Sequence, residues 1–400
     1  MSNSLLNISM ITKESLRVLK NELGFTKGVN RQYDDQFARS GAKIGSVINI
    51  RKPTRFTVSS GTALNLQDVA DQYSALTLDT QAHVDFSFSS KELTLNIDEF
   101  SKRYVKPAVA ELANYVDFTG TALYKQVYNA TGTPGTTPNA FSFLTDAGTK
   151  LSNFGTPVDS DRNMVLNPAA SGSLADALKG LFQSQERIKE QYEKGLMGMA
   201  AGFNIKMDQN VQQFTNATFA GTPLVNGASQ TGSTLVSDGW SSGATTLKEG
   251  TIFTIANVYA VNPKNRQSTG QLQQFVVTAD ISDTSGAISI PISPSITLTG
   301  AYQTVNALPA DNAAITVLGS TATAYPQNLA YHKDAFVLGC ADLDLPGGTD
   351  MAARATDPDS GLSLRIVRAY DISNDTFPCR VDILYGWKCV YPELACRIYG

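Results

Sequence analysis

The sequence has 400 residues with a formal net charge of −4, and 42% of its residues are hydrophobic while 17% are charged. This balance is typical of a folded chain with more than one domain. It argues against a largely disordered protein and against one dedicated to nucleic-acid binding. No stretch approaches the roughly 18 apolar residues that span a bilayer, and the N-terminal segment lacks the pattern of a secretory signal, so we expect a soluble chain that is not exported by this route.

The charge is unevenly distributed along the chain. Residues 1–55 carry ten lysines and arginines against four acidic residues, so this segment is +6 and the remainder is −10. A basic arm on an acidic body suggests a partner of opposite sign, which would be a neighbouring copy, an acidic protein or a polyanion. A solvated basic surface without a partner is an equally acceptable interpretation.

The first elements are a short helix and an extended ribbon. Leucines at helical spacing predict an amphipathic helix that Thr12 caps and Gly24 ends. Residues 45–61 read as a strand, an interruption at Lys52-Pro53 and a second strand, and residues 83–97 alternate as one half-buried strand. We expect the two segments to pair across the polar stretch 59–82 and to lie on their own domain or on a neighbouring subunit.

Helical and mixed patterns follow. A long helix is predicted from Pro107 to Asn129, and the pair Asn96 and Glu99 resembles a capping box before it. Residues 139–220 read as mixed α/β, with a helix around 140–151, a strand at 162–167 and helical stretches at 173–182 and 183–194.

Composition changes abruptly at Gly221. Residues 221–325 hold only eight charged side chains and contain short β-like runs separated by Gly, Pro, Asn and Asp. This pattern predicts an all-β barrel or sandwich. Because α/β patterns both precede and follow it, the domain is expected to be an insertion into a host domain.

The sequence offers little catalytic material. It lacks the local signatures of zinc proteases, nucleotide-binding loops and serine hydrolases. Only His83 and His332 are available for a histidine site, and the pairs Asp342/Asp344 and Asp357/Asp359 read as turns rather than calcium loops. Four cysteines without paired spacing are expected to be buried reduced thiols. We therefore expect no catalytic residue, no cofactor and no metal.

The stretch NLAYHKDAFVLGCADLDLPGG, residues 328–348, gathers the densest set of chemical groups. Its apolar run from Ala335 to Cys340 predicts a buried strand, with His332, Lys333 and Asp334 at its start and a Pro-Gly turn after it. The polar groups are thus expected to flank a strand, and no nucleophile is offered near a His332-Asp334 pair.

This stretch, together with LSLRIVRAYDISNDTFPCRVDILYGWKCVYPELACRIYG at 362–400, resembles the C-terminal part of major capsid proteins of short-tailed bacteriophages. The similar group of coat proteins carries an inserted β domain. The resemblance implies the tailed-phage major capsid protein fold, of class α+β, with an inserted all-β barrel or sandwich. By this resemblance the chain divides into an N-terminal arm (1–43), an extended β loop (44–95), a spine helix and peripheral domain (96–138), an axial domain (139–220 with 326–400) and the inserted domain (221–325).

The resemblance also implies the function. One chain would assemble with itself into pentamers and hexamers of an icosahedral virion capsid. Assembly would occur in the host cytoplasm, with a scaffolding protein and a portal protein, and the shell would expand as double-stranded DNA is packaged; no membrane is involved. The candidate assembly contacts are basic residues of the arm and loop: Lys13, Arg17, Lys20, Arg51, Lys52 and Arg55.

Two other functions remain open at this point. A tail protein or adhesin would explain the β-rich insertion but not the long helix between the ribbon and the α/β domain. An enzyme with dispersed carboxylates, such as a glycosidase, has no positive support in the sequence.

Overall fold

The structure is a computed structural model, in which the chain forms two compact units. Unit 1 comprises Met1–Ile50, Tyr73–Gly120 and Phe336–Lys388, and unit 2 comprises Arg51–Gln72, Thr121–Ala335 and Cys389–Gly400. Within the described part no helix is long and apolar enough to cross a bilayer. The described residues are 24–32, 46–62, 64, 66–67, 71–95, 104, 106–178, 198–241, 245–283, 288–356 and 362–400.

Three expectations fall outside these residues. They are the helix capped by Thr12, the capping pair Asn96 and Glu99, and the helical stretch 183–194.

Unit 1 is built on a sheet whose longest strand is β22 (Thr376–Cys389). On one side β22 pairs antiparallel with β3 (Thr80–Ser89), from Thr376 opposite Ser89 to Tyr385 opposite Thr80. On the other side it pairs antiparallel with β21. The sheet order is β19-β22-β21-β20, with β3 added at β22. The remaining strands are β19 (Phe336–Ala341), β20 (Met351–Thr356) and β21 (Ser363–Arg368).

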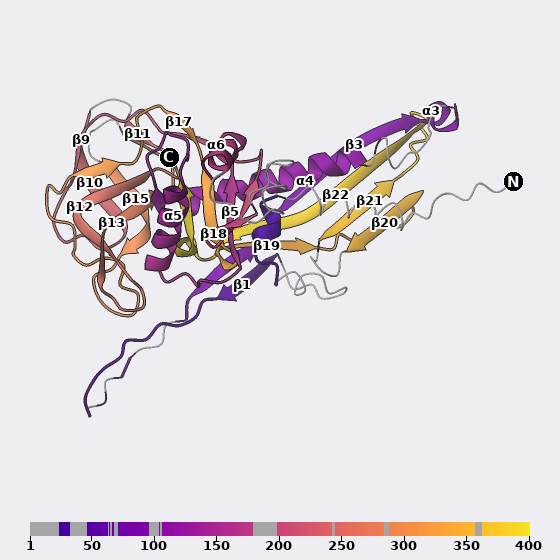
Figure 1. Cartoon of the computed structure of the whole chain (residues 1–400). Helices are drawn as coiled ribbons and strands as arrows, with labels where there is room; N and C mark the ends of the chain where they lie inside the picture. The colour runs from indigo at the N-terminus through magenta and orange to yellow at the C-terminus, as the bar shows by residue number, and fades with distance from the viewer. Residues whose placement is uncertain are drawn as a thin grey trace. The chain divides into compact units, whose positions relative to one another are not determined.

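Helix α4 (Lys106–Thr121) runs along β3 and β22 (Figure 1). Its Thr119 hydroxyl lies 3.0 Å from the Tyr385 hydroxyl, and the Trp387 indole N–H donates to the Val116 carbonyl at 3.2 Å. The predicted helix from Pro107 to Asn129 is therefore confirmed at its start. Its α-helical part ends earlier than predicted, at Thr121, because the chain tightens there into the 3-10 turn η3 (Ala122–Gln126).

Phe25 and Thr26 of the N-terminal arm are anchored in unit 1 by a buried carboxylate. Asp117 of α4 is fully buried and accepts hydrogen bonds from the backbone N–H groups of Phe25 and Thr26 at 3.2 and 3.0 Å. The Thr26 hydroxyl donates to the same carboxylate at 2.8 Å, at the start of η1 (Thr26–Gly28). Because these donors satisfy the buried charge, this anchor holds the arm to the body.

Three expectations about the ribbon were wrong. The strand expected after the Lys52-Pro53 interruption is absent, because residues 52–62 form no regular element. Strand β1 (Val47–Arg51) pairs with β2 (Tyr73–Thr77), which lies inside the stretch interpreted as a polar connection, and β3 joins the β22 sheet instead. The strand predicted for 83–97 also ends at Ser89, where helix α3 (Ser90–Leu95) begins. The Ser89 N–H donates to Glu92 at 3.0 Å and the Glu92 N–H donates to the Ser89 hydroxyl at 3.3 Å, a capping box that overrides the alternating pattern.

Unit 2 contains a six-stranded sheet, with the order β4-β23-β18-β5-β7-β6. Helices α5 (Phe141–Asn153) and α6 (Pro168–Leu178) share its core, where Leu144, Leu174 and Phe203 are completely buried. This confirms the helix expected around 140–151 and the strand expected at 162–167. The helical stretch expected at 173–182 begins earlier than predicted, at Pro168, and residues 179–182 lie outside the described ranges. The strands are β4 (Ala130–Thr131), β5 (Arg162–Leu166), β6 (Met199–Ala200), β7 (Phe203–Met207), β18 (Asn328–His332) and β23 (Ala395–Ile398), and the 3-10 turns are η4 (Lys333–Ala335) and η5 (Pro392–Leu394).

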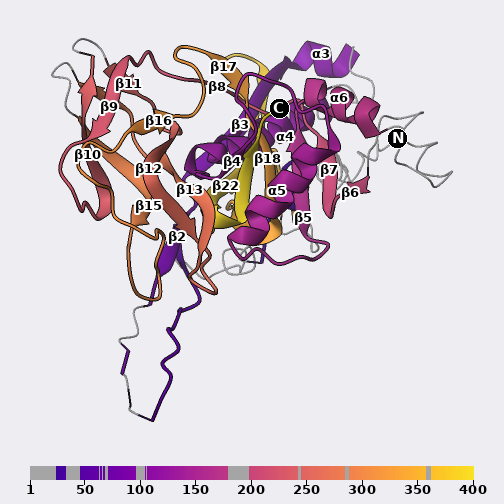
Figure 2. The same cartoon turned by 60° about the vertical axis from the view of Figure 1, so that its left-hand side comes forward.

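Residues 221–325 form the expected all-β structure within unit 2, and Figure 2 shows its strands curving around one core. The sheet order is β16-β12-β13-β15-β10-β9, and a bridge between Leu224 and Ala314 links its two edges into a partly closed barrel. The strands are β9 (Gly221–Val225), β10 (Gly232–Trp240), β11 (Thr245–Leu247), β12 (Ile252–Val261), β13 (Ser268–Val277), β14 (Ile281–Asp283), β15 (Ile288–Ile296) and β16 (Ile315–Val317).

A short stem carries this barrel. Strand β8 (Gln213–Thr215) pairs antiparallel with β17 (Ala324–Pro326), so the chain leaves and rejoins the host at neighbouring positions. The rings of Phe214 and Tyr325 pack edge to face across the stem, with centroids 6.0 Å apart. The barrel is thus inserted into the host through one pair of strands.

Candidate assembly loop and the His332 cluster

The candidate contact residues divide into two groups. Lys13, Arg17 and Lys20 lie outside the described residues, whereas Arg51, Lys52 and Arg55 lie at the base of the loop 51–72. The Lys52 N–H donates to the Gln72 carbonyl at 2.8 Å and closes this base. Further out, the Gln67 side-chain amide makes two hydrogen bonds with the backbone of Thr57 and joins the two arms of the loop.

The basic side chains of the loop base contact acidic and aromatic partners from distant parts of unit 2. Arg55 pairs with Glu393 at 3.1 Å and lies 5.8 Å from the centroid of the Tyr302 ring. The Lys52 ammonium lies 5.4 Å from the centroid of the Tyr391 ring. Arg51 is exposed. No sequence signal identifies Glu393 as the partner of Arg55, because the two residues are far apart along the chain.

Beyond its base the loop exposes apolar side chains. Val58 is 96% exposed, and Leu64 and Leu66 are each 84% exposed. Single exposed apolar residues are common on protein surfaces, but several on one extended loop mark a surface that is completed by a partner. This feature was missed at the sequence level because the stretch reads as a polar connection.

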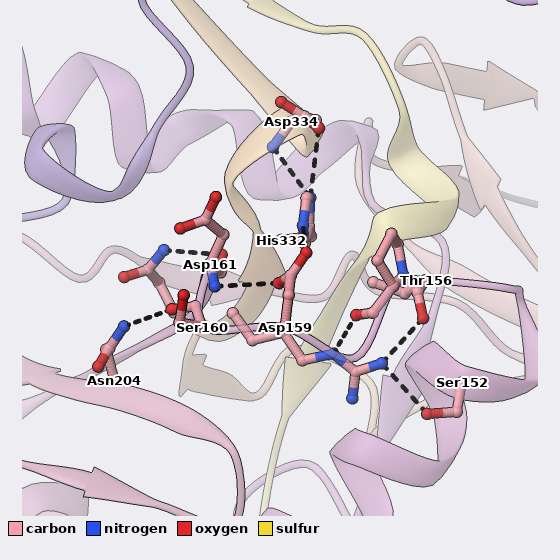
Figure 3. Close-up of polar contacts among 11 residues, drawn as sticks. Ser152, Thr156, Asp159, Ser160, Asp161, Asn204, His332 and Asp334 are labelled. Atoms are coloured by element: carbon pink, nitrogen blue, oxygen red, sulfur yellow. Dashed lines mark hydrogen bonds and ion pairs between the residues drawn. The ribbon is translucent and has the colours of Figure 1, made fainter.

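The histidine of the 328–348 stretch lies in a cluster of polar groups (Figure 3). His332, at the end of β18, is 4% exposed, and its Nε2 lies 3.1 Å from Asp159 Oδ2. Its Nδ1 lies 3.3 Å from the Asp334 N–H, which donates to it, and 3.6 Å from the Asp334 carboxylate. The imidazole therefore ties the loop before β5 to the turn after β18.

The neighbouring groups of the cluster hold the same loop. The Asp161 N–H donates to Asp159 at 3.0 Å, and Asn204 donates to the Ser160 carbonyl at 2.9 Å. Arg162 donates to the Pro157 and Thr156 carbonyls at 2.7 and 2.9 Å (Figure 3). These contacts fix the conformation of the backbone between α5 and β5.

The pKa of Asp159 is shifted by this environment. Desolvation alone would raise the pKa, but hydrogen bonds from His332 and from the Asp161 N–H, with electrostatic interactions with His332 and Arg162, outweigh it and lower the pKa of the carboxyl. Asp159 is thus held in its charged form as a hydrogen-bond acceptor.

The cluster has the composition of a structural tie rather than of a catalytic site. The side-chain polar contacts described for His332 are to the Asp159 carboxylate and to the carboxylate and N–H of Asp334, and none of these groups is a nucleophilic hydroxyl or thiol. Over the described ranges, no group of three or more His, Cys, Asp or Glu side chains could hold a metal ion. All four cysteines are buried reduced thiols, as expected. The pKa of Cys379 is raised to about 11 and that of Cys396 to about 12, mainly because burial removes the thiols from water.

A second charged cluster lies in unit 1. Asp382 of β22 is completely buried and accepts hydrogen bonds from Arg365 at 3.0 and 2.6 Å, from Arg380 at 3.1 Å and from Gln81 at 2.9 Å. Because several donors satisfy this carboxylate, the cluster holds β3, β22 and β21 together. The sequence alone does not reveal it, since Gln81 of β3 lies 301 residues before Asp382 along the chain.

These features are those of a structural protein with an extended contact loop, and a comparison with known families decides which one. The family model described as P22 coat protein, gene protein 5, matches residues 2–400. The chain belongs to the P22 coat protein family. It is a structural major capsid protein that forms the icosahedral shell of a tailed bacteriophage, with the mixed α+β fold of that class and an inserted β domain, and the resemblance found in the sequence is confirmed. Family membership also decides against the tail-protein and adhesin alternative.

Solved structures similar to this P22-type coat protein include other phage capsid structures. A structure titled Mycobacterium phage Che8 is 13% identical and covers 94% of this chain and 90% of its own, with a TM-score of 0.47. The asymmetric unit of the bacteriophage PhiM1 mature capsid is 11% identical, with coverages of 94% and 86% and a TM-score of 0.44. The CUS-3 coat protein I-domain is 28% identical over 25% of this chain and 98% of its own, with a TM-score of 0.20. Among curated proteins, none matches the chain.

Proposed function

We propose that this coat protein assembles as pentamers and hexamers through a scaffold-assisted procapsid, and that the shell expands when double-stranded DNA is packaged. The shell is assembled in the host cytoplasm around a portal protein, and the chain itself catalyses no reaction. The six-part division into arm, β loop, spine and peripheral domain, two axial segments and inserted domain belongs to the same proposal.

The observation that carries the assembly proposal is the apolar surface of the loop 51–72. Val58, Leu64 and Leu66 are almost fully exposed in the single chain, and covering them would remove apolar area from water. A second copy is the partner that a self-assembling shell supplies. Many such contacts, each weak, add up across a closed lattice.

The scaffold and DNA partners are supported by the charge of the arm. Residues 1–55 carry a net charge of +6, and a basic segment favours an acidic protein or a polyanion. The anchor at Asp117 holds Phe25 and Thr26 of this basic segment within unit 1. The arm could therefore exchange a scaffolding protein for packaged DNA without leaving the body.

The absence of a catalytic role is supported by the His332 cluster. Its imidazole is engaged by Asp159 and Asp334, and both partners act on the backbone around β5 and β18. The arrangement explains why this dense set of polar groups stabilises a strand boundary without performing chemistry.

The deciding experiment is expression of the chain with and without the scaffolding protein encoded beside it, followed by sedimentation and electron microscopy. Closed shells of uniform diameter that require the scaffold are expected. A small oligomer that never closes would contradict the proposal. Replacing Lys13, Arg17 and Lys20 by Glu should reduce shell yield, and yield equal to that of the unaltered chain would show that the arm charge is not used.

A further inference from the structure

One residue of the inserted barrel has a strained backbone. Arg266, in the turn between β12 and β13, has a φ of 55°, in the left-handed region that glycine adopts freely and other residues avoid. The turn that imposes this conformation is well defined. The Arg266 N–H donates to the Asn262 carbonyl at 2.8 Å, and the Asn262 side chain accepts from the Lys264 N–H at 2.9 Å. Glycine at this position would relieve the strain, so the arginine needs another reason.

The side chain of Arg266 supplies that reason. Its Nη2 donates to the Phe56 carbonyl of the loop 51–72, the assembly loop, at 2.7 Å. Its Nε is buried and has no hydrogen-bond partner among the described residues. Leaving the buried Nε without a partner costs free energy. The guanidinium of Arg266 therefore reaches the Phe56 carbonyl at an energetic cost.

Directional contacts join the described part of the loop to the barrel. The loop base and the β12–β13 turn line one cavity of about 290 Å³, which includes Lys52, Arg55 and Pro263 in its wall. Beside this cavity, Arg266 donates to the Phe56 carbonyl, and the Arg55 guanidinium lies 5.8 Å from the centroid of the Tyr302 ring.

These contacts act on the first part of the loop, which is where its direction is set. Phe56 precedes Thr57, whose backbone is joined to the returning arm by the Gln67 amide. Fixing residues 55–57 therefore orients both arms, and with them the exposed side chains at Val58, Leu64 and Leu66.

We propose that Arg266 is a positioning residue through which the inserted barrel sets the direction of the assembly loop, and that its left-handed backbone is retained for this contact. The consequence for the shell rests on the proposed function, in which the loop meets a second copy. The positioning itself belongs to the single chain and can be measured before assembly.

The first test compares Arg266→Gly and Arg266→Ala in the unassembled full-length chain. Both variants remove the contact with Phe56, but only glycine relieves the strain. Tryptic cleavage of the Arg55–Phe56 bond should become at least about fivefold faster in both, because the opening of this segment is no longer opposed. The melting temperature should be higher for Arg266→Gly than for Arg266→Ala.

A matched control is Asn312→Gly, which relieves another left-handed residue of the same barrel, with a φ of 56°. Asn312 has its side chain on Asp311 and its N–H on the Val225 carbonyl, so its replacement should leave cleavage after Arg55 unchanged. Arg266→Lys, which keeps a cationic donor, should restore part of the protection. Equal cleavage rates in the unaltered chain and in Arg266→Gly would overturn the positioning role.

The second test uses shells assembled with scaffold. Arg266→Gly should give shells with a broader range of diameters than Asn312→Gly, although its chain is no less stable. Shells as uniform as those of the control would overturn the link between loop direction and assembly. If the unaltered chain forms no shells at all, the proposed function fails while the cleavage result still stands.

Discussion

Asp159 gives the His332 cluster a defined pH dependence. Its pKa is lowered in the folded chain, so the unfolded chain binds the proton more tightly. The resulting stabilisation is present above about pH 4 and is lost as the pH falls through the lower folded pKa. The neighbouring loop conformation should therefore weaken in acid before the rest of unit 2.

Replacing this carboxyl by an amide tests the dependence. The melting temperature of the unaltered chain should fall more steeply between about pH 5 and about pH 3 than that of Asp159→Asn, which cannot gain the proton. Thermal unfolding followed by circular dichroism at several pH values measures this. Asp161→Asn is the control, since Asp161 contacts the cluster through its backbone, and equal slopes for all three chains would contradict the assignment.

Residue-scale reasoning from sequence placed His332 at the start of a buried strand but did not identify the residues that it contacts. The apolar run after it predicted the buried strand β19, and the polar residues flank that strand as expected. Asp159 is distant in sequence, and a single chain without its fold gives no way to choose it among 36 acidic residues. Short-range chemistry is readable from sequence, and long-range pairing is not.

At the scale of elements, the close packing of α4 on its sheet depends on a glycine, Gly120. Gly120 lies under the Trp387 indole, and a Cβ built there would meet Trp387 Cζ2 at 2.5 Å. Alanine ordinarily stabilises a helix relative to glycine by about 1 kcal/mol. Here the ring lies against the helix and is held by its hydrogen bond to the Val116 carbonyl, so the usual gain is reversed.

Two glycine replacements separate these effects. Gly120→Ala should lower the free energy of unfolding by about 1–3 kcal/mol through overpacking. Gly148→Ala in α5 should raise it by about 0.5–1 kcal/mol, because its nearest neighbour, Phe203, lies at an ordinary 3.5 Å. Chemical denaturation of the unassembled chain measures both. A stabilised Gly120→Ala chain would show that α4 does not pack on Trp387 in this way.

Elements differed in how well the sequence predicted them. Strands β12, β13, β15 and β16 of the barrel were found because each is an apolar run bounded by turn residues, whereas β9 and β10 were not identified. The start of α3 was missed although its signal was present, since Ser89 and Glu92 have capping-box spacing and the alternating pattern around them was given more weight. The partner of β1 was missed for a different reason: alternation identifies a strand but does not say which other strand it joins.

At the scale of the whole molecule, folding and assembly should respond to different residues. Val58→Asp places a charge on a side chain that is 96% exposed, so the stability of the single chain should change by less than about 0.5 kcal/mol. Shell yield should fall several-fold, because the same charge would have to be buried against a second copy. Ser60→Asp adds the same charge to the same loop without removing apolar surface.

Sedimentation of scaffold-assisted assembly reactions compares the two variants. Reduced yield for Val58→Asp with near-normal yield for Ser60→Asp is the expected pattern. Equal yields would indicate that the apolar side chain of Val58 is not covered in the shell.

The two-strand stem of the inserted barrel has a consequence for how such a protein can change over generations. Gln213 lies opposite Pro326 and Thr215 opposite Ala324, so the host chain continues along the same path whatever is placed between them. A genetic exchange with one crossover on each side of this block would replace the whole barrel and leave the register of both host sheets intact. Lineages of this coat protein can therefore acquire new inserted domains by recombination, provided that each new domain supplies its own contact with the loop 51–72, as Arg266 does here.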